Sequence, residues 1–115
     1  MIPNYKLDCK HINRVKFDKV LVIGLGRLGL PVAKYVKDKG FDTYGYDSSP
    51  RAIEKAREEA IEKSVDFSKF DVFIICVSTH KPDDMFSPQI DGLFSIVEKI
   101  SREAKNGALV SIEST

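Results

Sequence analysis

The stretch Lys19–Pro31, KVLVIGLGRLGLP, decides the fold of this chain. An apolar run leads into three glycines, Gly24, Gly26 and Gly29, with the spacing Gly-x-Gly-x-x-Gly. Apolar residues at helical spacing follow the glycines. This order predicts a strand, a tight turn and a helix.

A strand, turn and helix of this kind suit the binding of a pyrophosphate. Gly24 would allow the sharp turn, Gly26 would let a phosphate approach the backbone, and Gly29 would let the helix pack closely on the strand. The phosphates would lie against free N–H groups at the positive end of the helix dipole. The alternative is a unit that keeps the turn for structural reasons alone. The candidate cofactor-binding residues of this loop are Gly24, Leu25, Gly26, Arg27, Leu28 and Gly29.

An acidic residue after the next predicted strand supports dinucleotide binding. The strand covers residues 41–46, and Asp47 follows at about the spacing where a carboxylate accepts hydrogen bonds from the adenosine ribose. A carboxylate there should repel a 2′-phosphate, which predicts NAD rather than NADP as the cofactor. Tighter binding of NADPH would mean that Arg27 or Arg51 outweighs Asp47. Arg51 is therefore also a candidate cofactor-binding residue.

The rest of the chain alternates predicted helices and buried strands. We expect helices at 28–39, at 50–63 and from Ser87–Pro88 to about 105, and further strands at 71–77 and 108–112. The inward helix positions would be Leu28, Val32 and Val36; Ile53, Ala56, Ala60 and Ile61; and Ile90, Leu93, Phe94, Val97 and Ile100. Between these elements, 64–70 reads as a turn with at most a short strand at 65–67.

This alternation predicts an α/β fold: a Rossmann-type, doubly wound parallel sheet in three layers, forming a single domain over residues 19–115. Residues 1–18 would be an N-terminal arm or an edge strand. Ligands of such sheets bind at the carboxyl ends of the strands. Four segments should meet there: the glycine loop, Asp47, Val77–Ser78–Thr79 and Ser114–Thr115.

Composition narrows the function classes. The 115 residues suffice for one domain, and 43% hydrophobic with 30% charged residues is ordinary for a soluble protein. A formal net charge of +1 gives no reason to expect nucleic acid or a membrane as partner. The two cysteines, Cys9 and Cys76, lack metal-ligand spacing, so we expect free thiols, no metal site and a cytoplasmic protein.

Four segments together resemble the NAD-binding domain of the UDP-glucose/GDP-mannose (nucleotide-sugar) dehydrogenases. They are Gly24–Ala33 (GLGRLGLPVA), Tyr46–Asp47, Ile74–Thr79 (IICVST) and Ile112–Thr115 (IEST). The first and last are the most specific, because a bare Gly-x-Gly-x-x-Gly requires neither the Leu-Pro nor the Glu-Ser-Thr.

The resemblance implies a function and residue roles. Members of this family oxidise the C6 hydroxyl of a nucleotide sugar in two NAD-dependent hydride transfers. By resemblance, Val77 and Thr79 approach the nicotinamide-side ribose and Ser114 borders the nicotinamide. Thr115 matches a catalytic threonine that orders a water or a substrate oxygen. We expect NAD and a nucleotide sugar as partners, and a homodimer for the full-length enzyme.

Some features depart from the family pattern. Arg27 stands where the family usually has tyrosine, and it either covers the pyrophosphate or is solvated. Ser78 replaces a usual proline, and the segment between Asp47 and Asp71 is shorter than in typical members. The nucleophilic cysteine of the family lies beyond the Ser-Thr, and Cys76, inside an apolar strand, reads as a packed thiol.

These departures suggest a domain that binds NAD without turnover and belongs to a longer enzyme. Two alternatives remain open. One is the NAD-binding domain of a β-hydroxyacid dehydrogenase, which shares the glycine motif. The other is a non-catalytic module that senses NAD.

Overall fold

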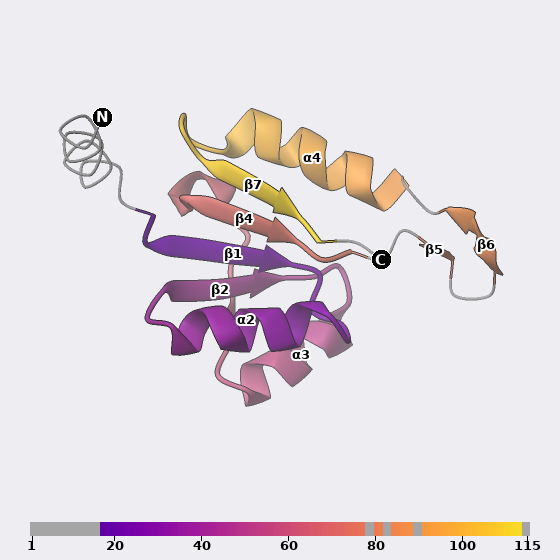
Figure 1. The fold of residues 1–115 in the computed structure, drawn as a ribbon, viewed down its shortest axis with the longest axis horizontal. Coiled ribbons are helices and arrows are strands. Elements are labelled where there is room, and N and C mark those ends of the chain that lie inside the picture. Colours follow the sequence, from indigo (N-terminus) through magenta and orange to yellow (C-terminus); the bar gives the residue numbers. More distant parts are fainter. Residues whose placement is uncertain (1–16, 78–79, 82–83, 89–90, 114–115) are drawn as a thin grey trace, which may run out of the picture.

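A five-stranded parallel sheet forms the centre of the molecule in the computed structural model, which describes residues 17–77, 80–81, 84–88 and 91–113. Its strand order is β3-β2-β1-β4-β7, and the visible arrowheads all point the same way (Figure 1). The strands are β1 (Lys19–Ile23), β2 (Asp42–Tyr46), β3 (Glu62–Lys63), β4 (Val72–Ile75) and β7 (Leu109–Ile112). Neighbours β1 and β4 are separated by two other strands in sequence, so the strand order reverses between them.

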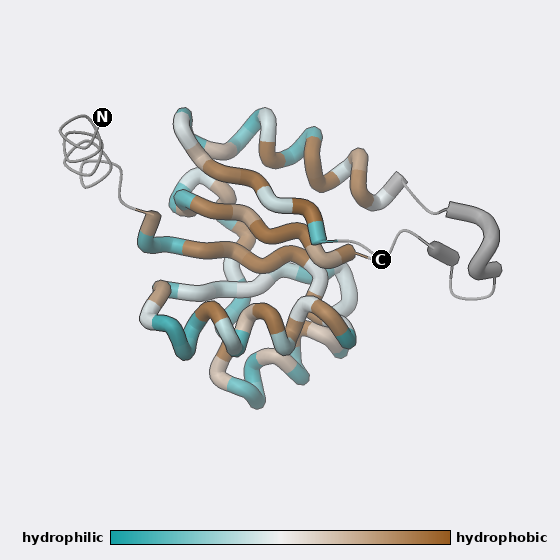
Figure 2. Tube along the Cα trace, in the orientation of Figure 1, coloured by the Kyte–Doolittle hydropathy of each residue, from teal (hydrophilic) through white to brown (hydrophobic). Residues whose placement is uncertain are grey.

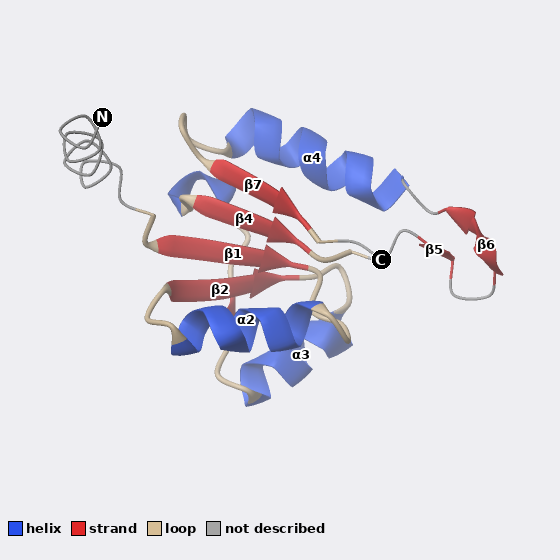
Figure 3. Ribbon diagram, viewed as in Figure 1, coloured by secondary structure: helices blue, strands red, loops and turns tan. Residues whose placement is uncertain are grey.

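Helices cover both faces of this sheet, and they divide the core into two apolar clusters (Figure 3). Helices α2 (Gly29–Asp38) and α3 (Pro50–Glu58) pack on one face. Helix α4 (Asp91–Glu103) and the 3₁₀ helix η1 (Phe67–Lys69) pack on the other. The expected three-layer, doubly wound Rossmann-type fold is therefore confirmed.

Strand β1 shows why the sequence folds this way. Val20 and Val22 enter the cluster beneath α2 and α3, while Leu21 and Ile23 enter the cluster beneath α4. Successive side chains of a strand point to opposite faces, so a continuous apolar run requires cover on both. In Figure 2 the hydrophobic colouring accordingly runs along the neighbouring strands β1 and β4, whereas β2 is pale.

The segment 64–70 contributes more to the core than its sequence suggests. Phe67 and Phe70 are almost completely buried. The Phe67 ring lies 5.6 Å from that of Phe73 and meets Tyr46 edge-on at 5.5 Å. The short strand expected at 65–67 is wrong, because β3 lies at Glu62–Lys63 and residue 67 opens η1.

Helix α3 ends earlier than the expected residue 63. It stops at Glu58, and Ala60 adopts a left-handed conformation with φ of 67°. This turn frees the chain to form β3 beside β2. Ile53, Ala56 and Ile61 are at least partly buried as expected, but Ala60 is exposed.

The inward faces of the other helices also differ in part from expectation. Leu28 is exposed, and α2 buries Leu30 and Ala33 instead, with Val32 and Val36 half-buried. Helix α4 starts at Asp91, whereas Ser87 and Pro88 belong to strand β6 (Asp84–Pro88). Its inner side is formed by Leu93, Ile96 and Ile100, while Phe94 and Val97 are exposed.

Strand β7 is exposed, although its sequence predicts a buried strand. Leu109, Val110 and Ile112 all have large exposed fractions. The reason is its place in the sheet, since β7 is the last strand in the order and pairs only with β4. The exposure of β7 therefore depends on its position in the sheet, which the apolar content of its sequence does not reveal.

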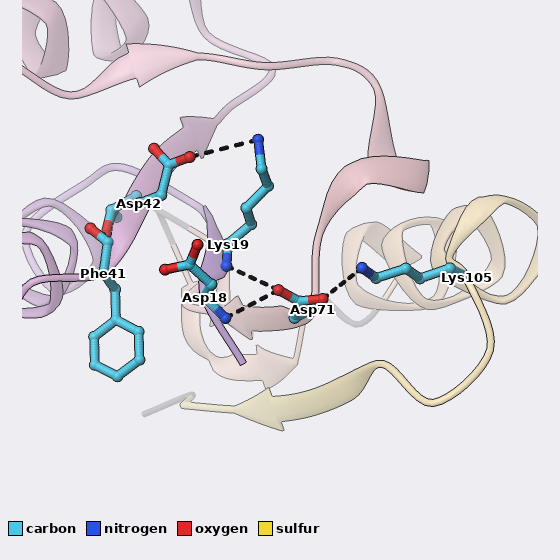
Figure 4. A network of polar contacts seen from close by, with 7 residues as sticks. Asp18, Lys19, Phe41, Asp42, Asp71 and Lys105 are labelled. Carbon is cyan, nitrogen blue, oxygen red and sulfur yellow. Dashed lines mark hydrogen bonds and ion pairs between the residues drawn. The ribbon is translucent and has the colours of Figure 1, made fainter. Parts of the chain in front are cut away.

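A polar network ties the amino-terminal ends of the strands together (Figure 4). Asp71 Oδ2 accepts hydrogen bonds from the N–H groups of Asp18 and Lys19, both at 2.9 Å, and Oδ1 pairs with Lys105. Burial raises the pKa of Asp71, but these partners lower it more strongly, to about 2. Because the folded-state pKa lies below the ordinary 3.8, the network contributes its stability above about pH 4 and loses it as the pH falls toward 2.

Two further segments complete the description. Strands β5 (His80–Lys81) and β6 pair antiparallel as a separate two-stranded sheet where a polar loop is expected. Of the predicted N-terminal arm, residues 1–16 lie outside the described residues, and Phe17 and Asp18 are exposed and non-helical.

Candidate functional site

A pocket opens at the carboxyl ends of β1, β2 and β4, where the strand order reverses. We call it the carboxyl-edge pocket; its volume is about 830 Å³. This is the place where open α/β sheets bind ligands. Its lining residues are Ile23, Gly24, Gly26, Arg27, Leu28, Tyr46, Asp47, Ser48, Cys76, Val77, Gly92, Ser95 and Ile96.

Two of the loop glycines are required by the fold itself. Gly24 has φ of 94°, and a Cβ there would lie 2.8 Å from the backbone of Cys76. A Cβ at Gly29 would overlap the carbonyl oxygen of Gly24 and crowd the Cys76 side chain. These contacts explain the turn after β1 and the close packing of α2 against the neighbouring strand end.

Gly26 differs from both. It is exposed, its φ lies outside the left-handed region, and a Cβ at this position would meet nothing within 4 Å. Nothing in the described part of the chain therefore requires glycine here. Because Gly26 has no side chain, its backbone stays accessible on the wall of the carboxyl-edge pocket. A phosphate needs such access to come close to the backbone.

The amino-terminal end of α2 leaves its donors open. Leu28, at the cap position, makes no capping hydrogen bond with its side chain, and the first turn carries no acidic residue. Within the described residues, the N–H groups of Gly26, Arg27 and Leu28 have no hydrogen-bond acceptor. Free N–H groups at the positive end of a helix dipole form a site suited to an anion.

Asp47 links the glycine loop to the start of α3. Its Oδ2 accepts the Leu25 N–H at 2.8 Å, and its Oδ1 accepts the Ser49 N–H at 2.8 Å. The carboxylate is thus held in place at the pocket wall. Each carboxylate oxygen has a second lone pair, so both can still accept a hydrogen bond from a ribose hydroxyl.

Cys76 lines the same pocket but is not activated. Burial raises the pKa of its thiol to about 11, with a further contribution from Glu113. A thiol that stays protonated at neutral pH is a poor nucleophile. Its environment agrees with a packed side chain.

Most of the described candidate residues meet at this site. Gly24, Gly26, Arg27, Leu28, Asp47 and Val77 all line the pocket. Gly29 is buried, and Leu25 and Arg51 line a neighbouring groove instead. Four candidates lie outside the described residues: Ser78, Thr79, Ser114 and Thr115.

Sequence reasoning missed the contribution of α4. Gly92, Ser95 and Ile96 line the pocket opposite the glycine loop, and Tyr46 and Ser48 flank Asp47. The topology could have predicted this contribution, because every helix that follows a parallel strand starts at the carboxyl edge of the sheet. The first turn of α4 therefore had to lie near this edge.

Comparison with protein families agrees with this geometry. Residues 19–110 match the family described as the NAD binding domain of 6-phosphogluconate dehydrogenase. The chain belongs to this family. It is an NAD-binding domain, and the expected cofactor is confirmed as NAD.

This NAD-binding domain is homologous to nucleotide-sugar dehydrogenases. It is 30% identical over 120 residues to the UDP-N-acetyl-D-mannosamine dehydrogenase of Pyrococcus horikoshii, covering 84% of this chain and 28% of that protein. The enzyme of the same name from Methanocaldococcus jannaschii is 31% identical over 119 residues, with the same coverage. The chain thus spans about 28% of the length of these curated relatives.

Solved structures show the same relationship for this domain of the NAD-binding family. The UDP-N-acetyl-mannosamine dehydrogenase of S. aureus superposes with a TM-score of 0.70 at 28% identity, covering 85% of this chain and 28% of that one. The 3-hydroxyisobutyrate dehydrogenase of Mycobacterium tuberculosis also reaches 0.70, at 17% identity, covering 87% of this chain and 32% of that one. At this low identity, the similarity to the 3-hydroxyisobutyrate dehydrogenase shows a common fold alone.

Among the described residues, no group of three or more His, Cys, Asp and Glu side chains is arranged to hold a metal ion. No helix within the described ranges has the length and apolarity needed to cross a membrane.

Proposed function

We propose that this chain is the NAD-binding part of a nucleotide-sugar 6-dehydrogenase that acts on a UDP-sugar. One structural observation carries the binding role: the open N–H groups of the glycine loop lie in the same pocket wall as the fixed carboxylate of Asp47. Relatives called UDP-N-acetyl-D-mannosamine dehydrogenase, matching 84% of the chain, support the substrate class. NAD, when bound, accepts a hydride from C6 of the sugar in the complete enzyme.

Different residues of the pocket bind different parts of NAD. The N–H groups of Gly26, Arg27 and Leu28 donate to the pyrophosphate, and the positive end of α2 stabilises its charge. Asp47 accepts hydrogen bonds from the adenosine ribose, and its bonds to Leu25 and Ser49 fix it for that task. No rearrangement of Asp47 is then needed on binding.

The remaining roles follow the family resemblance. Val77, at the end of β4, and Thr79 would approach the nicotinamide-side ribose, and Ser78 belongs to the same loop. Ser114 would border the nicotinamide, and Thr115 would order a water or a substrate oxygen. The complete enzyme would work in the cytoplasm as a homodimer, whereas this domain alone would bind NAD without turnover.

Titration with NADH tests the binding role. Nicotinamide fluorescence should rise saturably as the protein is added, and Asp47→Ala should weaken binding at least tenfold, because it removes charged hydrogen bonds. Asp42→Ala is the matched control, since Asp42 lies at the opposite end of the same strand with only an exposed ion pair to Lys19. Equal affinities for the two variants, both folded by circular dichroism, would contradict the assignment.

A β-hydroxyacid dehydrogenase is the second candidate. The matched family is described by 6-phosphogluconate dehydrogenase, and the L-threonate dehydrogenase of Pectobacterium atrosepticum is 29% identical over 101 residues. Absorbance at 340 nm separates the two in a polypeptide that joins this domain to its catalytic part. NADH formation with UDP-hexoses supports our proposal, whereas formation only with hydroxyacids supports the second candidate. NADH binding without turnover of either substrate by that polypeptide would favour a sensing module.

A further inference from the structure

Strand β7 exposes an apolar surface at one edge of the described sheet, away from the carboxyl-edge pocket. Val110 and Ile112 pair in register with Phe73 and Ile75, so their side chains lie on the face of the sheet that α4 covers. They nevertheless remain exposed, by 41% and 51%. Leu109, which points to the other face, is exposed as well.

Helix α4 extends this apolar surface on one face. Ser95 lines the carboxyl-edge pocket, and the Lys99 ammonium lies 4.5 Å from the centre of the Phe67 ring, so this flank of α4 faces β1 and η1. Phe94 and Val97 lie on the opposite flank, toward the open edge of β7, and both are exposed. We call Leu109, Val110, Ile112, Phe94 and Val97 the β7–α4 surface.

The two edges of the described sheet differ in charge. The opposite edge is β3, whose two residues, Glu62 and Lys63, are both charged and exposed. Charged side chains on a short edge strand discourage pairing with another chain. No charged residue occurs between Lys105 and Glu113, so β7 lacks this protection. A sheet with a single unprotected edge can pair once, which gives a closed dimer and no filament.

The backbone of β7 also has hydrogen-bonding groups directed away from the sheet. The N–H groups of Leu109 and Glu113 donate to β4 and its preceding residue, at 2.8 and 2.7 Å. Successive residues of a strand direct their backbone groups to alternate sides. The N–H and C=O groups of Val110 and Ile112 therefore point to the open side of β7, where the described residues supply no partner.

We propose that the β7–α4 surface binds a second copy of this chain through antiparallel pairing of the two β7 strands. A two-fold axis passes beside Ser111, and Val110 of each copy lies opposite Ile112 of the other. Each of these two pairs exchanges two N–H···O bonds, so both open residues of β7 are satisfied. The two sheets join into one, and the apolar side chains of the β7–α4 surface are brought together. This association is independent of the proposed NAD-binding role.

Charge favours the antiparallel orientation. Lys105 precedes β7 and Glu113 follows it, so the strand has a basic side chain before one end and an acidic one after the other. Antiparallel pairing brings Glu113 of one copy toward the Lys105 end of the other, whereas parallel pairing would place the two Glu113 carboxylates together. Lys105 also pairs with Asp71, but an ammonium group has three donors and can bind both carboxylates.

Sedimentation equilibrium over a range of protein concentrations tests the association. The unaltered chain should approach twice the mass of one chain as its concentration rises. Val110→Lys should raise the dissociation constant of the dimer at least tenfold, because it places a charge in the apolar strand pair. Val65→Lys is the matched control, since Val65 is also exposed but lies beside β3, and it should leave the dimer unchanged.

A disulfide at the two-fold axis tests the register. Ser111 of each copy would face its equivalent in a pair without hydrogen bonds, where the Cα atoms are about 4.5 Å apart, within the range of a disulfide. In a Cys9→Ser background, which leaves the buried Cys76, Ser111→Cys should form covalent dimers on mild oxidation. Leu109→Cys should not, because its equivalents lie at opposite ends of the paired strands. A non-reducing gel measures both.

Three results would overturn the inference. A chain that stays monomeric at every concentration, with no cross-linking of Ser111→Cys, would leave the β7–α4 surface without a second copy; an unfolding midpoint lowered by Val110→Lys would then show that another segment of the chain covers it. A dimer that Val110→Lys does not weaken would lie elsewhere. Equal cross-linking of Leu109→Cys and Ser111→Cys would exclude the register. NADH titration of folded Val110→Lys should match the unaltered chain, since Val110 does not line the carboxyl-edge pocket; weaker binding would contradict the proposed independence of the two surfaces.

Discussion

Helices α2 and α3 pack side by side on the same face of the sheet, yet their amino-terminal ends are built in opposite ways. Helix α3 begins with Ser49, whose hydroxyl oxygen accepts the Ala52 N–H, and with proline at its first position. Helix α2 begins without a capping side chain. At the other ends, the chain leaves α2 through Gly40, with φ of 99°, and leaves α3 through Ala60, with φ of 67°.

The contrast separates what the fold requires from what a ligand requires. The start of α3 satisfies its own backbone and needs no partner from outside the chain. The start of α2 leaves N–H groups open on a pocket wall, which is unfavourable for the isolated helix and suitable for a bound anion. Four substitutions test this distinction, beginning with the largest expected effect.

Gly29→Ala should destroy the start of α2. The new Cβ would overlap the Gly24 carbonyl oxygen inside a buried turn, so we expect a loss of more than about 3 kcal/mol of stability. Thermal unfolding followed by circular dichroism measures this loss. Gly92→Ala is the control, because a Cβ at that position meets nothing within 4 Å. This variant should keep a cooperative thermal unfolding transition. An unchanged midpoint for Gly29→Ala would show that the loop can relax.

Gly26→Ala should affect binding instead of folding. With no neighbour within 4 Å of the added Cβ, the unfolding midpoint should stay within about 2 °C of the original, equivalent to less than about 0.5 kcal/mol. The methyl group would obstruct the approach of the pyrophosphate, so the NADH affinity should fall at least tenfold, or about 1.4 kcal/mol. Fluorescence titration measures the affinity. Unaltered affinity would mean that the phosphates bind elsewhere.

Ser49→Ala tests the capped start of α3. Removing the hydroxyl that accepts the Ala52 N–H should cost about 1 kcal/mol of stability, as measured by urea denaturation. The Ser49 N–H that holds Asp47 is retained, so NADH affinity should change far less than in Gly26→Ala. A larger loss of affinity than of stability would show that the two helix starts are not separate in function.

Ala60→Gly addresses the far end of α3 and should have the smallest effect. Glycine adopts a left-handed conformation without the Cβ strain of alanine, so the variant should gain about 0.5 kcal/mol. The urea midpoint should rise, whereas Ala52→Gly, inside the same helix, should lower it. A fall for Ala60→Gly would indicate that the strain at this turn is negligible.

Much of the fold and the described site could be predicted from short patterns. The continuous apolar runs of β1 and β4 require cover on both faces, and they correctly predicted a doubly wound sheet. The glycine loop and Asp47 were predicted as neighbours, and the structure joins them through the Leu25 N–H. Such features are readable because they depend on local backbone geometry and on strand periodicity.

Other features depend on contacts between distant segments. The burial of Phe67 follows from its packing on Tyr46 and Phe73, which no local pattern reveals. The left-handed turn at Ala60 is not marked by a glycine in the sequence. The predicted helix at 50–63 is therefore five residues longer than α3. Strand β7 is apolar enough for a buried strand but exposed at the edge of the described sheet.

The sequence by itself determined the parallel sheet, the turn after β1 and the acid after β2, because each is written in residues close together in the chain. Only the tertiary structure decided which of the three loop glycines is not required for folding. Gly24 and Gly29 are enclosed by neighbouring backbone, whereas Gly26 faces open space. It also placed Arg27 and Arg51 on one groove beside Asp47, since that arrangement arises when α2 and α3 pack on the same face of the sheet.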